Sequence, residues 1–288
     1  MTSTYTTLIT AAQLKALQAR GAPLAIFDCS YDLMQKTVGD QSYETIHIQN
    51  ALRADLHRDL SVQDKGHAAS GGRHPLPNRE QFAQWLGRHG VSNASQVVVY
   101  DRNGAMFCGR LWWMLKWLGH DAVAVLDGGL AAWQAAEGAC QTGQSPKVQA
   151  CSFELKKPLV RLVDASTVLA RLGRLDQTLI DARAPARFKG ETEPLDPIAG
   201  HIPGALNRIF SSNLDEHGFF KPAGQLRTEF EALLSGRNTE GVVHHCGSGV
   251  SAVPNLLAME LAGLTGTALY AGSWSDWCSD ASRPVAQG

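Results

Sequence analysis

Residues 241–251, with the sequence GVVHHCGSGVS, are the part of this chain best suited to chemistry. An apolar run that predicts a strand delivers Cys246 to a short glycine-rich loop. Gly247 and Gly249 are predicted to adopt unusual dihedrals and to let backbone N–H groups converge above the sulfur. A thiolate, or a sulfur anion carried on it, is stabilised in such a loop. The pattern predicts an activated cysteine, although a free cysteine is more commonly a buried small hydrophobe.

The elements around this loop are predicted to be parallel strands joined by helices. Apolar residues recur at helical spacing from Val253 to Leu264, so the positive end of a helix would face the sulfur. Short runs rich in Val, Ile and Leu lack alternating polarity, which indicates strands buried on both faces. The predicted strands are 96–100, 122–126, 179–181, 242–244 and 268–270, and the predicted helices are 11–19, 80–89, 109–118, 165–172 and 226–234.

Length and charge set the broad class of the protein. At 288 residues the chain suggests two domains, at about 150 residues per domain. Its 26 basic and 27 acidic residues nearly balance, so no electrostatic feature points to nucleic acid or to an anionic membrane as a partner. The N-terminus lacks a basic leader with a long apolar run, and no stretch is long and apolar enough to span a bilayer. A cytoplasmic location is therefore predicted.

The cysteines are predicted to be reduced thiols, because they are widely spaced in a chain with no recognisable export signal. They are Cys29, Cys108, Cys140, Cys151, Cys246 and Cys278. No CxxC pair occurs, and the adjacent residues His244, His245 and Cys246 would point alternately to opposite faces of a strand. That arrangement is a poor metal site, so neither a metal nor another cofactor is predicted.

The two halves of the chain share a series of landmarks in one register. The Asp-to-His spacing is 19 residues in the first half and 20 in the second, and the spacing from the loop residue to a Trp is 32 and 31. The landmarks are Asp28, His47, Asp101 and Trp133 in the first half, and Asp181, His201, Cys246 and Trp277 in the second. Two copies of one fold are the economical interpretation. Because His47 and His201 recur in both halves, these histidines are predicted to be architectural.

The repeat predicts an N-terminal domain over residues 1–140, a linker over 141–160 and a C-terminal domain over 161–288. The linker is predicted because residues 138–158 carry Gly, Ser and Pro without a helical stripe. In the first copy Asp101 occupies the loop position that Cys246 occupies in the second. An aspartate cannot act as a sulfur nucleophile, so only the C-terminal copy is predicted to be catalytic.

Five motifs together resemble the two-domain rhodanese-type sulfurtransferases, over roughly residues 8–280. They are LDGGLAAW (126–133), DARAPARF (181–188), GHIPGALN (200–207), CGSGVSA (246–252) and YAGSWSDW (270–277). The resemblance implies an α/β protein of two tandem rhodanese-like domains, each a mainly parallel sheet flanked by helices. The cysteine loop is similar to that of the 3-mercaptopyruvate sulfurtransferases, whereas relatives that prefer thiosulfate usually carry basic residues directly after the cysteine.

The resemblance implies that Cys246 takes sulfane sulfur from 3-mercaptopyruvate, a small-molecule donor, and holds it as a persulfide. The acceptor would be cyanide, a low-molecular-weight thiol or a thioredoxin-like protein. Backbone N–H groups would solvate the terminal sulfur, and they belong to Gly247, Ser248, Gly249, Val250 and Ser251. Cys278 is a possible resolving thiol on its spacing alone.

The resemblance also assigns residues to donor binding and proton transfer. Arg187 of DARAPARF would bind the donor's anion, since a guanidinium donates two parallel hydrogen bonds to a carboxylate. A surface ion pair with Glu191 or Glu193 is the alternative. His74 of GGRHPLP and Ser248 of the cysteine loop would form a proton relay, and the neighbouring Arg73 is a further anion-binding candidate.

Two departures from the family pattern bear on the donor. Where the family's relay often has an acidic residue, this chain has His57, with Asp55 and Asp59 two residues to either side. Where mercaptopyruvate-specific members commonly have a second arginine after Glu-Pro, this chain has Leu195. Binding of a donor carboxylate is then expected to rest more heavily on Arg187.

Three other functions compete with mercaptopyruvate sulfur transfer. Thiosulfate is an alternative donor, and a carrier module that accepts a persulfide without turning over a small donor is another alternative. A cysteine-dependent phosphatase needs an arginine six residues after the cysteine, and Ala252 occupies that position. Phosphoryl transfer is therefore not expected.

Overall fold

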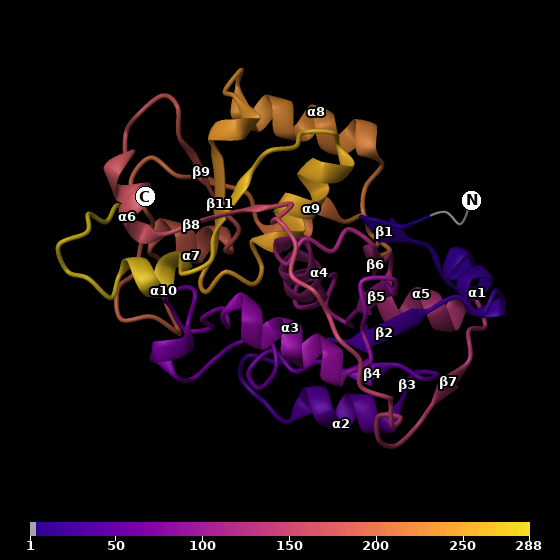
Figure 1. Cartoon of the computed structure of the whole chain (residues 1–288). Coiled ribbons are helices and arrows are strands. Elements are labelled where there is room, and N and C mark those ends of the chain that lie inside the picture. The colour runs from indigo at the N-terminus through magenta and orange to yellow at the C-terminus, as the bar shows by residue number, and fades with distance from the viewer. Residues whose placement is uncertain (1–3) are drawn as a thin grey trace. The chain divides into compact units, whose positions relative to one another are not determined.

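The computed structural model describes residues 4–288, which fold into two compact units (Figure 1). The first unit contains the chain up to Ser61 together with Pro77–Leu159 and Glu216–Phe219. The second unit contains Val62–Leu76, Val160–Asp215 and Phe220–Gly288. The segment Val62–Leu76 thus belongs to the second unit, although residues of the first unit flank it in sequence.

A five-stranded parallel sheet forms the centre of the first unit. Its strands are β1 (Leu8–Ile9), β2 (Leu24–Asp28), β4 (Leu52–Arg53), β5 (Gln96–Tyr100) and β6 (Val123–Leu126), and the helices are α1 (Ala11–Ala19), α2 (Val38–Thr45), α3 (Arg79–Arg88), α4 (Cys108–Trp117) and α5 (Gly129–Ala135). The strand order is β1-β6-β5-β2-β4. A separate antiparallel pair joins β3 (His47–Ile48) to β7 (Cys140–Gln141).

The second unit is built around a sheet of the same kind. Its strands are β8 (Arg161–Val163), β9 (Thr178–Asp181), β10 (Leu206–Asn207), β11 (Val242–His245) and β12 (Ala268–Tyr270), and the helices are α6 (Ala165–Ala170), α7 (Pro185–Lys189), α8 (Ala223–Leu234), α9 (Val253–Leu261) and α10 (Ser273–Trp277). All five strands are parallel in the order β10-β9-β11-β12-β8. Helices α6 and α10 cover one face of the sheet, and α9, with α8 against it, covers the other (Figure 1).

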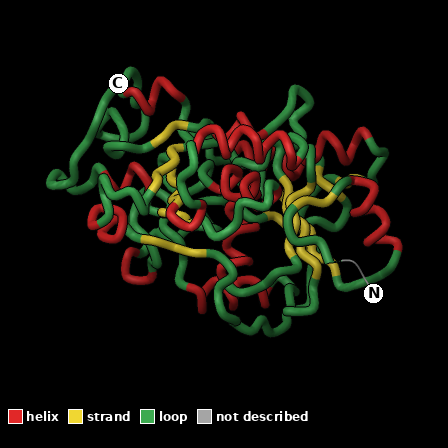
Figure 2. Tube along the Cα trace, turned by 90° about the horizontal axis from the view of Figure 1, so that it is seen from above, coloured by secondary structure: helices red, strands yellow, loops and turns green. Residues whose placement is uncertain are grey.

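The two sheets have one topology, which confirms the interpretation as a repeat. Written from the first strand of each unit, the orders are β1-β6-β5-β2-β4 and β8-β12-β11-β9-β10, so each strand has a counterpart. Figure 2 shows the strands as two groups, each flanked by helices. Because β5 corresponds to β11, the loop that begins at Asp101 corresponds to the loop that begins at Cys246. The two parallel sheets with their flanking helices confirm the predicted α/β fold.

The predicted elements are found within a few residues of their predicted bounds. Strands β5, β11 and β12 are buried except at Gln96, because both sheet faces are covered and no alternation of polarity is needed. Helix α1 begins at Ala11 because Thr10 and Gln13 form a reciprocal capping box, in which each side chain accepts a hydrogen bond from the other residue's backbone N–H.

The repeated histidines have one structural role in both units. His47 stacks on Tyr43 with ring centroids 3.8 Å apart, and its Nδ1 lies 2.7 Å from the carbonyl oxygen of Tyr43. His201 stacks on Phe188 at the same 3.8 Å, with its Nδ1 2.8 Å from the carbonyl oxygen of Phe188. Both rings pack against the residue whose carbonyl they bond, as an architectural histidine does.

The loop after β5 binds a carboxylate at the position that Cys246 occupies in the other unit. Asp101 is buried, and its Oδ1 accepts hydrogen bonds from the N–H groups of Asn103 and Ala105 at 2.9 and 3.0 Å. Its Oδ2 accepts from the N–H groups of Phe107 and Cys108 at 2.8 and 2.9 Å. Four backbone donors thus converge on a negative charge at this point of the fold.

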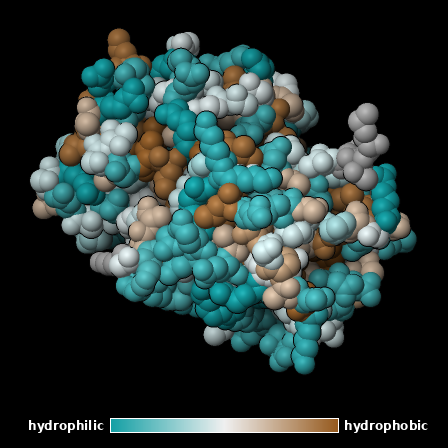
Figure 3. All heavy atoms as spheres, viewed as in Figure 1, coloured by the Kyte–Doolittle hydropathy of each residue, from teal (hydrophilic) through white to brown (hydrophobic). Residues whose placement is uncertain are grey.

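On the face drawn in Figure 3, hydrophilic residues predominate and apolar residues appear as separate patches. Within residues 4–288, the helices are too short or too polar to cross a bilayer.

Candidate functional site

Cys246 lies at the carboxyl end of the central strand of the second unit. It follows directly after β11 and is nearly fully buried. The loop 246–252 separates it from the first residue of α9, so the N-terminus of that helix follows the loop, as predicted. Parallel sheets place ligands at the carboxyl ends of their strands. The loop that corresponds to the four-donor cradle of Asp101 therefore carries a thiol here.

The two glycines of the loop differ from each other. Gly249 has φ +73°, and a Cβ there would collide with the carbonyl oxygen of Ala271, so only glycine is accommodated. Gly247 has no positive φ, and the prediction of an unusual backbone at this residue is wrong. A Cβ on Gly247 would instead lie 3.3 Å from Nη2 of Arg73 and 3.5 Å from Nη1 of Arg187. The guanidinium groups of both arginines therefore lie against the residue that follows Cys246.

Helix α10 fixes the backbone of the cysteine. The N–H of Trp274 donates to the carbonyl oxygen of Cys246, and the N–H of Ser275 donates to that of Gly247, each at 2.9 Å. Ser273 Oγ accepts from the N–H of Cys246 at 3.1 Å and donates to the carbonyl oxygen of Tyr270 at 2.9 Å. The motif GSWSDW thus anchors the cysteine loop through its backbone, a role that its spacing alone did not reveal.

The segment Val62–Leu76 brings His74 to the cysteine loop. His74 is buried, and its Nδ1 lies 2.8 Å from Oγ of Ser248. The N–H of Arg73 donates to Oγ of Ser275 at 2.9 Å. Gly72 permits this approach, since it has φ +88° and a Cβ there would collide with the carbonyl oxygen of Gly272. The segment therefore runs directly along the start of α10.

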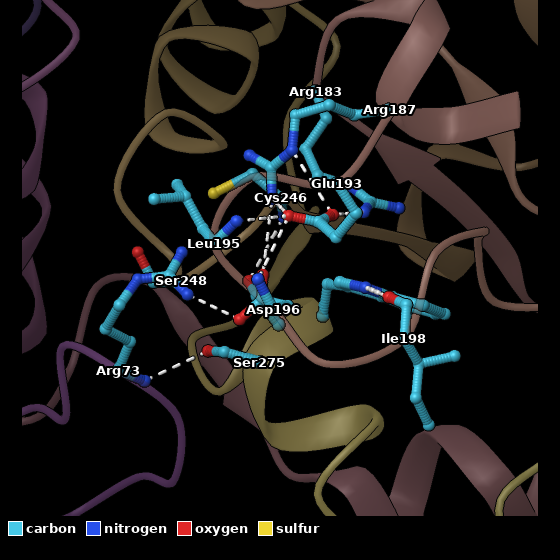
Figure 4. Close-up of polar contacts among 12 residues, drawn as sticks. Arg73, Arg183, Arg187, Glu193, Leu195, Asp196, Ile198, Cys246, Ser248 and Ser275 are labelled. Carbon is cyan, nitrogen blue, oxygen red and sulfur yellow. Dashed lines mark hydrogen bonds and ion pairs between the residues drawn. The ribbon is translucent and has the colours of Figure 1, made fainter. Parts of the chain in front are cut away.

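Four charged side chains form a cluster beside the loop (Figure 4). Asp196 bridges two arginines: it pairs with Nη1 of Arg73, and its Oδ2 lies 3.2 Å from Nη2 of Arg187. Glu193 accepts from Arg187 at 2.6 Å (Nη2) and 3.3 Å (Nε). Arg187 is thus ion-paired with Glu193, one of its two predicted acidic partners, but its side chain is only 18 % exposed. The pair lies in the site and is not a loose surface contact.

Arg183 extends the cluster into the core. Its guanidinium donates to both carboxylate oxygens of Asp181 at 2.7–3.1 Å, and it lies over the ring of Trp274 at 4.8 Å from the ring centroid. Nη1 of Arg183 lies 3.4 Å from Oε2 of Glu193. Burial opposes ionisation of Asp181, but the charge of Arg183 and the hydrogen bonds that it donates lower the pKa of this carboxyl. We call Arg73, Asp196, Arg187, Glu193, Arg183 and Asp181 the ion-pair cluster.

The histidines before the cysteine are neutral core residues. Both are fully buried, and burial lowers the pKa of His244 to about 3. Burial likewise lowers the pKa of His245, although Asp181 opposes that shift. A neutral histidine carries no charge with which to stabilise a neighbouring thiolate.

Cys278 is a poor resolving thiol. It is buried among apolar residues of the second unit, and its pKa is raised by burial and, to a smaller extent, by the charge of Asp196. Since the thiolate is the nucleophile in thiol exchange, both effects reduce its reactivity.

A cavity of about 550 Å³ borders the ion-pair cluster at Arg73 and Asp196. Its lining includes Arg73, Leu195, Asp196, Ser275 and Ser279. Leu195 therefore lines the cavity at the position where the family pattern has a second arginine, and Arg73 is the cation on this wall.

Three further residues that the sequence pointed to are Val250, Ser251 and Asp55. Val250 is buried and Ser251 is partly exposed, and both stay within the cysteine loop. Asp55, in the first unit, accepts at Oδ1 from the N–H groups of His57 and Arg58 at 2.9 Å. Its Oδ2 pairs with Arg53 at 3.2 Å.

The sequence assigned no role to Arg183 or Asp196, and it suggested Glu193 only as a surface partner of Arg187. A signal was present, because three acidic residues occur between DARAPARF and GHIPGALN in a segment with no strand or helix pattern. Acidic residues in such a segment predict cationic partners elsewhere in the fold.

Comparisons with known proteins agree with this architecture. The profile of the rhodanese-like domain matches the chain twice, over residues 10–136 and 164–280. A probable 3-mercaptopyruvate sulfurtransferase from Pseudomonas aeruginosa is 46% identical over 282 residues, which are 98% of each chain. A putative thiosulfate sulfurtransferase, SseB, from Mycobacterium tuberculosis is 38% identical, with 98% of this chain and 97% of that protein covered.

Among solved structures, SseA from Escherichia coli, described as a 3-mercaptopyruvate sulfotransferase, superposes with a TM-score of 0.77 and 30% identity. The match covers 94% of this chain and 100% of that one. These similarities span both units and confirm the resemblance that the five motifs carried. The chain belongs to the rhodanese family, with two rhodanese-like domains in tandem.

Proposed function

We propose that this protein is a sulfurtransferase that takes the thiol sulfur of 3-mercaptopyruvate onto Cys246 as a persulfide and passes this sulfane sulfur to a thiol or to cyanide. The observation that carries the proposal is the position of this cysteine. It stands where the other unit holds the Asp101 carboxylate with four backbone N–H groups. The names of the Pseudomonas and Escherichia relatives support the choice of donor.

The first half-reaction forms one sulfur–sulfur bond and breaks one carbon–sulfur bond. The Cys246 thiolate attacks the sulfur of the donor, and the electron pair of the carbon–sulfur bond leaves on carbon as the enolate of pyruvate. A proton on that carbon completes pyruvate. In the second half-reaction an acceptor thiolate or cyanide attacks the outer sulfur, and the electron pair of the sulfur–sulfur bond returns to Cys246. Between the two half-reactions, the sulfur anion is stabilised by the backbone N–H groups of the loop from Gly247 to Ser251, which include those of Gly249 and Val250.

The donor's carboxylate is held by Arg187 and Arg73 in this proposal. Their guanidinium groups both lie beside Gly247, so they meet an anion bound directly above the reactive sulfur. A guanidinium offers parallel donors to a carboxylate. Arg73 supplies the second cation, in place of the arginine that the family pattern has where this chain has Leu195.

Ser248 and His74 form the proton relay. Their hydrogen bond of 2.8 Å allows the serine hydroxyl to protonate the departing enolate and to recover a proton from the imidazole. Thiosulfate needs no such step, because it leaves sulfite, which is a stable anion.

The relay predicts a donor-specific effect of His74→Ala. We expect turnover of 3-mercaptopyruvate to fall about 100-fold, since general acid catalysis contributes on this order. Thiocyanate formation from thiosulfate should stay within a few-fold of the parent. His67→Ala is the matched control, because His67 lies on the same segment with its side chain exposed and paired to Asp64. Equal losses for both donors in His74→Ala would show that the histidine only maintains the structure.

The donor assignment is tested by comparing pyruvate release from 3-mercaptopyruvate with thiocyanate formation from thiosulfate, each with cyanide as acceptor. We expect a larger kcat/KM for 3-mercaptopyruvate. A clear preference for thiosulfate would instead assign the activity named for the Mycobacterium relative.

The physiological acceptor is proposed to be a low-molecular-weight thiol or a thioredoxin-like protein, in the cytoplasm. Support comes from the cysteines, since all six are free thiols in the structure, as expected in a reducing compartment.

A further inference from the structure

The ion-pair cluster is electrically balanced without any substrate. Three guanidinium groups alternate with three carboxylates, in the order Arg73, Asp196, Arg187, Glu193, Arg183 and Asp181. The acidic side chains are each no more than 4 % exposed, so water screens their charges little. The positive charge that the two arginines beside the cysteine loop present to an incoming anion is therefore partly cancelled by these carboxylates.

Asp196 is the acidic member that faces only those two arginines. Its carboxylate pairs with Arg73 and Arg187, whose guanidinium groups lie beside Gly247. Glu193 has a different role, because its Oε1 also accepts from the N–H groups of Leu195 and Asp196 at 3.0 and 3.1 Å. Glu193 thus holds the turn that presents Asp196.

We propose that Asp196 is a specificity-determining residue that selects a singly charged donor over a doubly charged one. This inference rests on the proposed function, since it concerns the anion that Arg187 and Arg73 bind there. The negative charge of Asp196 cancels one of the two positive charges at the mouth of the loop. A monocarboxylate such as 3-mercaptopyruvate brings one negative charge into this field, whereas thiosulfate brings two. Asp196 therefore repels bound thiosulfate more strongly.

Coulomb's law makes the selection quantitative. The repulsion between Asp196 and a bound dianion is about twice that for a monoanion at the same position. If removal of the Asp196 charge lowers the dissociation constant of a monoanion by a factor f, it lowers that of a dianion by about the square of f. A change in geometry alone would not produce this squared relation between the effects on a dianion and on a monoanion.

The experiment measures binding of pyruvate and sulfate, a monoanion and a dianion without transferable sulfur, by calorimetry at fixed ionic strength. In Asp196→Asn we expect the dissociation constant of pyruvate to fall about threefold and that of sulfate about tenfold. Asp196→Glu keeps the charge and should keep the parent's ratio. Glu191→Gln is the matched control, because Glu191 lies in the same segment but is exposed and pairs with Lys189 at 3.8 Å.

The kinetic counterpart is a larger gain in kcat/KM for thiosulfate than for 3-mercaptopyruvate in Asp196→Asn. Weaker binding of both anions, or equal tightening of both, would overturn the proposal and make Asp196 only a brace for Arg73. Failure of the proposed function is seen separately, in the parent protein. If the parent binds both anions but transfers no sulfur from either donor, the function fails while the binding ratio still tests Asp196.

Discussion

Replacing Cys246 by serine should lower sulfur transfer from 3-mercaptopyruvate and from thiosulfate by a factor on the order of 10⁴, because a hydroxyl cannot form a persulfide. Both donors pass their sulfur to the same atom, so both reactions should be lost together. Pyruvate and thiocyanate formation, measured with cyanide as acceptor, check the result. The fold should persist, since serine retains the backbone N–H and C=O groups that hold this residue to Ser273 and Trp274.

Cys278→Ser is the control for this experiment. Cys278 lies in the same unit and is also buried, but burial raises the pKa of its thiol. Its replacement should leave the transfer rate within a few-fold of the parent. Residual transfer by Cys246→Ser that disappears when Cys278 is also replaced would move the nucleophile to Cys278.

Replacing Arg187 by alanine should raise the KM for 3-mercaptopyruvate about 100-fold, because hydrogen bonds to a charged group contribute roughly 1.5–3 kcal/mol. The guanidinium lies 3.5 Å from a Cβ placed on Gly247, so it is positioned to touch an anion above the sulfur. Arg187→Lys should fall between the two, since an ammonium group keeps the charge but loses the parallel donors. Steady-state kinetics over a range of donor concentrations separates KM from kcat.

Lys189→Ala is the matched control for Arg187, because Lys189 is an exposed cation on the same helix α7. Its removal should leave KM unchanged at constant ionic strength. A fall in kcat without a change in KM for Arg187→Ala would contradict anion binding and indicate that loss of the ion pair with Glu193 disturbs the loop.

Much of the fold could be predicted because its determinants are local. Strand β5 is apolar after Gln96, β11 begins with two valines, and both strands lack the alternating polarity of a sheet with one face in water. The repeat then made the uniqueness of Cys246 visible, because Asp101 occupies the corresponding loop. The structure added the physical meaning of that difference, namely the cradle of four N–H groups around the carboxylate.

The parts of the site that could not be predicted depend on contacts between distant residues. Arg73 and Asp196 are 123 positions apart, and no local pattern shows that Val62–Leu76 joins the second unit. The role of α10 in holding the cysteine backbone likewise depends on hydrogen bonds that span 27 or more residues. Gly247 was misjudged for a related reason, since its small size is matched to the arginines beside it and not to its own dihedrals.

The persulfide on Cys246 is tested most directly by mass spectrometry of the protein after incubation with 3-mercaptopyruvate in the absence of an acceptor. The account predicts that the intact chain gains the mass of one sulfur atom, that the added sulfur maps to the peptide containing Cys246, and that cyanide removes it as thiocyanate. Release of pyruvate with no sulfur on Cys246, or sulfur found only on another cysteine, would contradict the account.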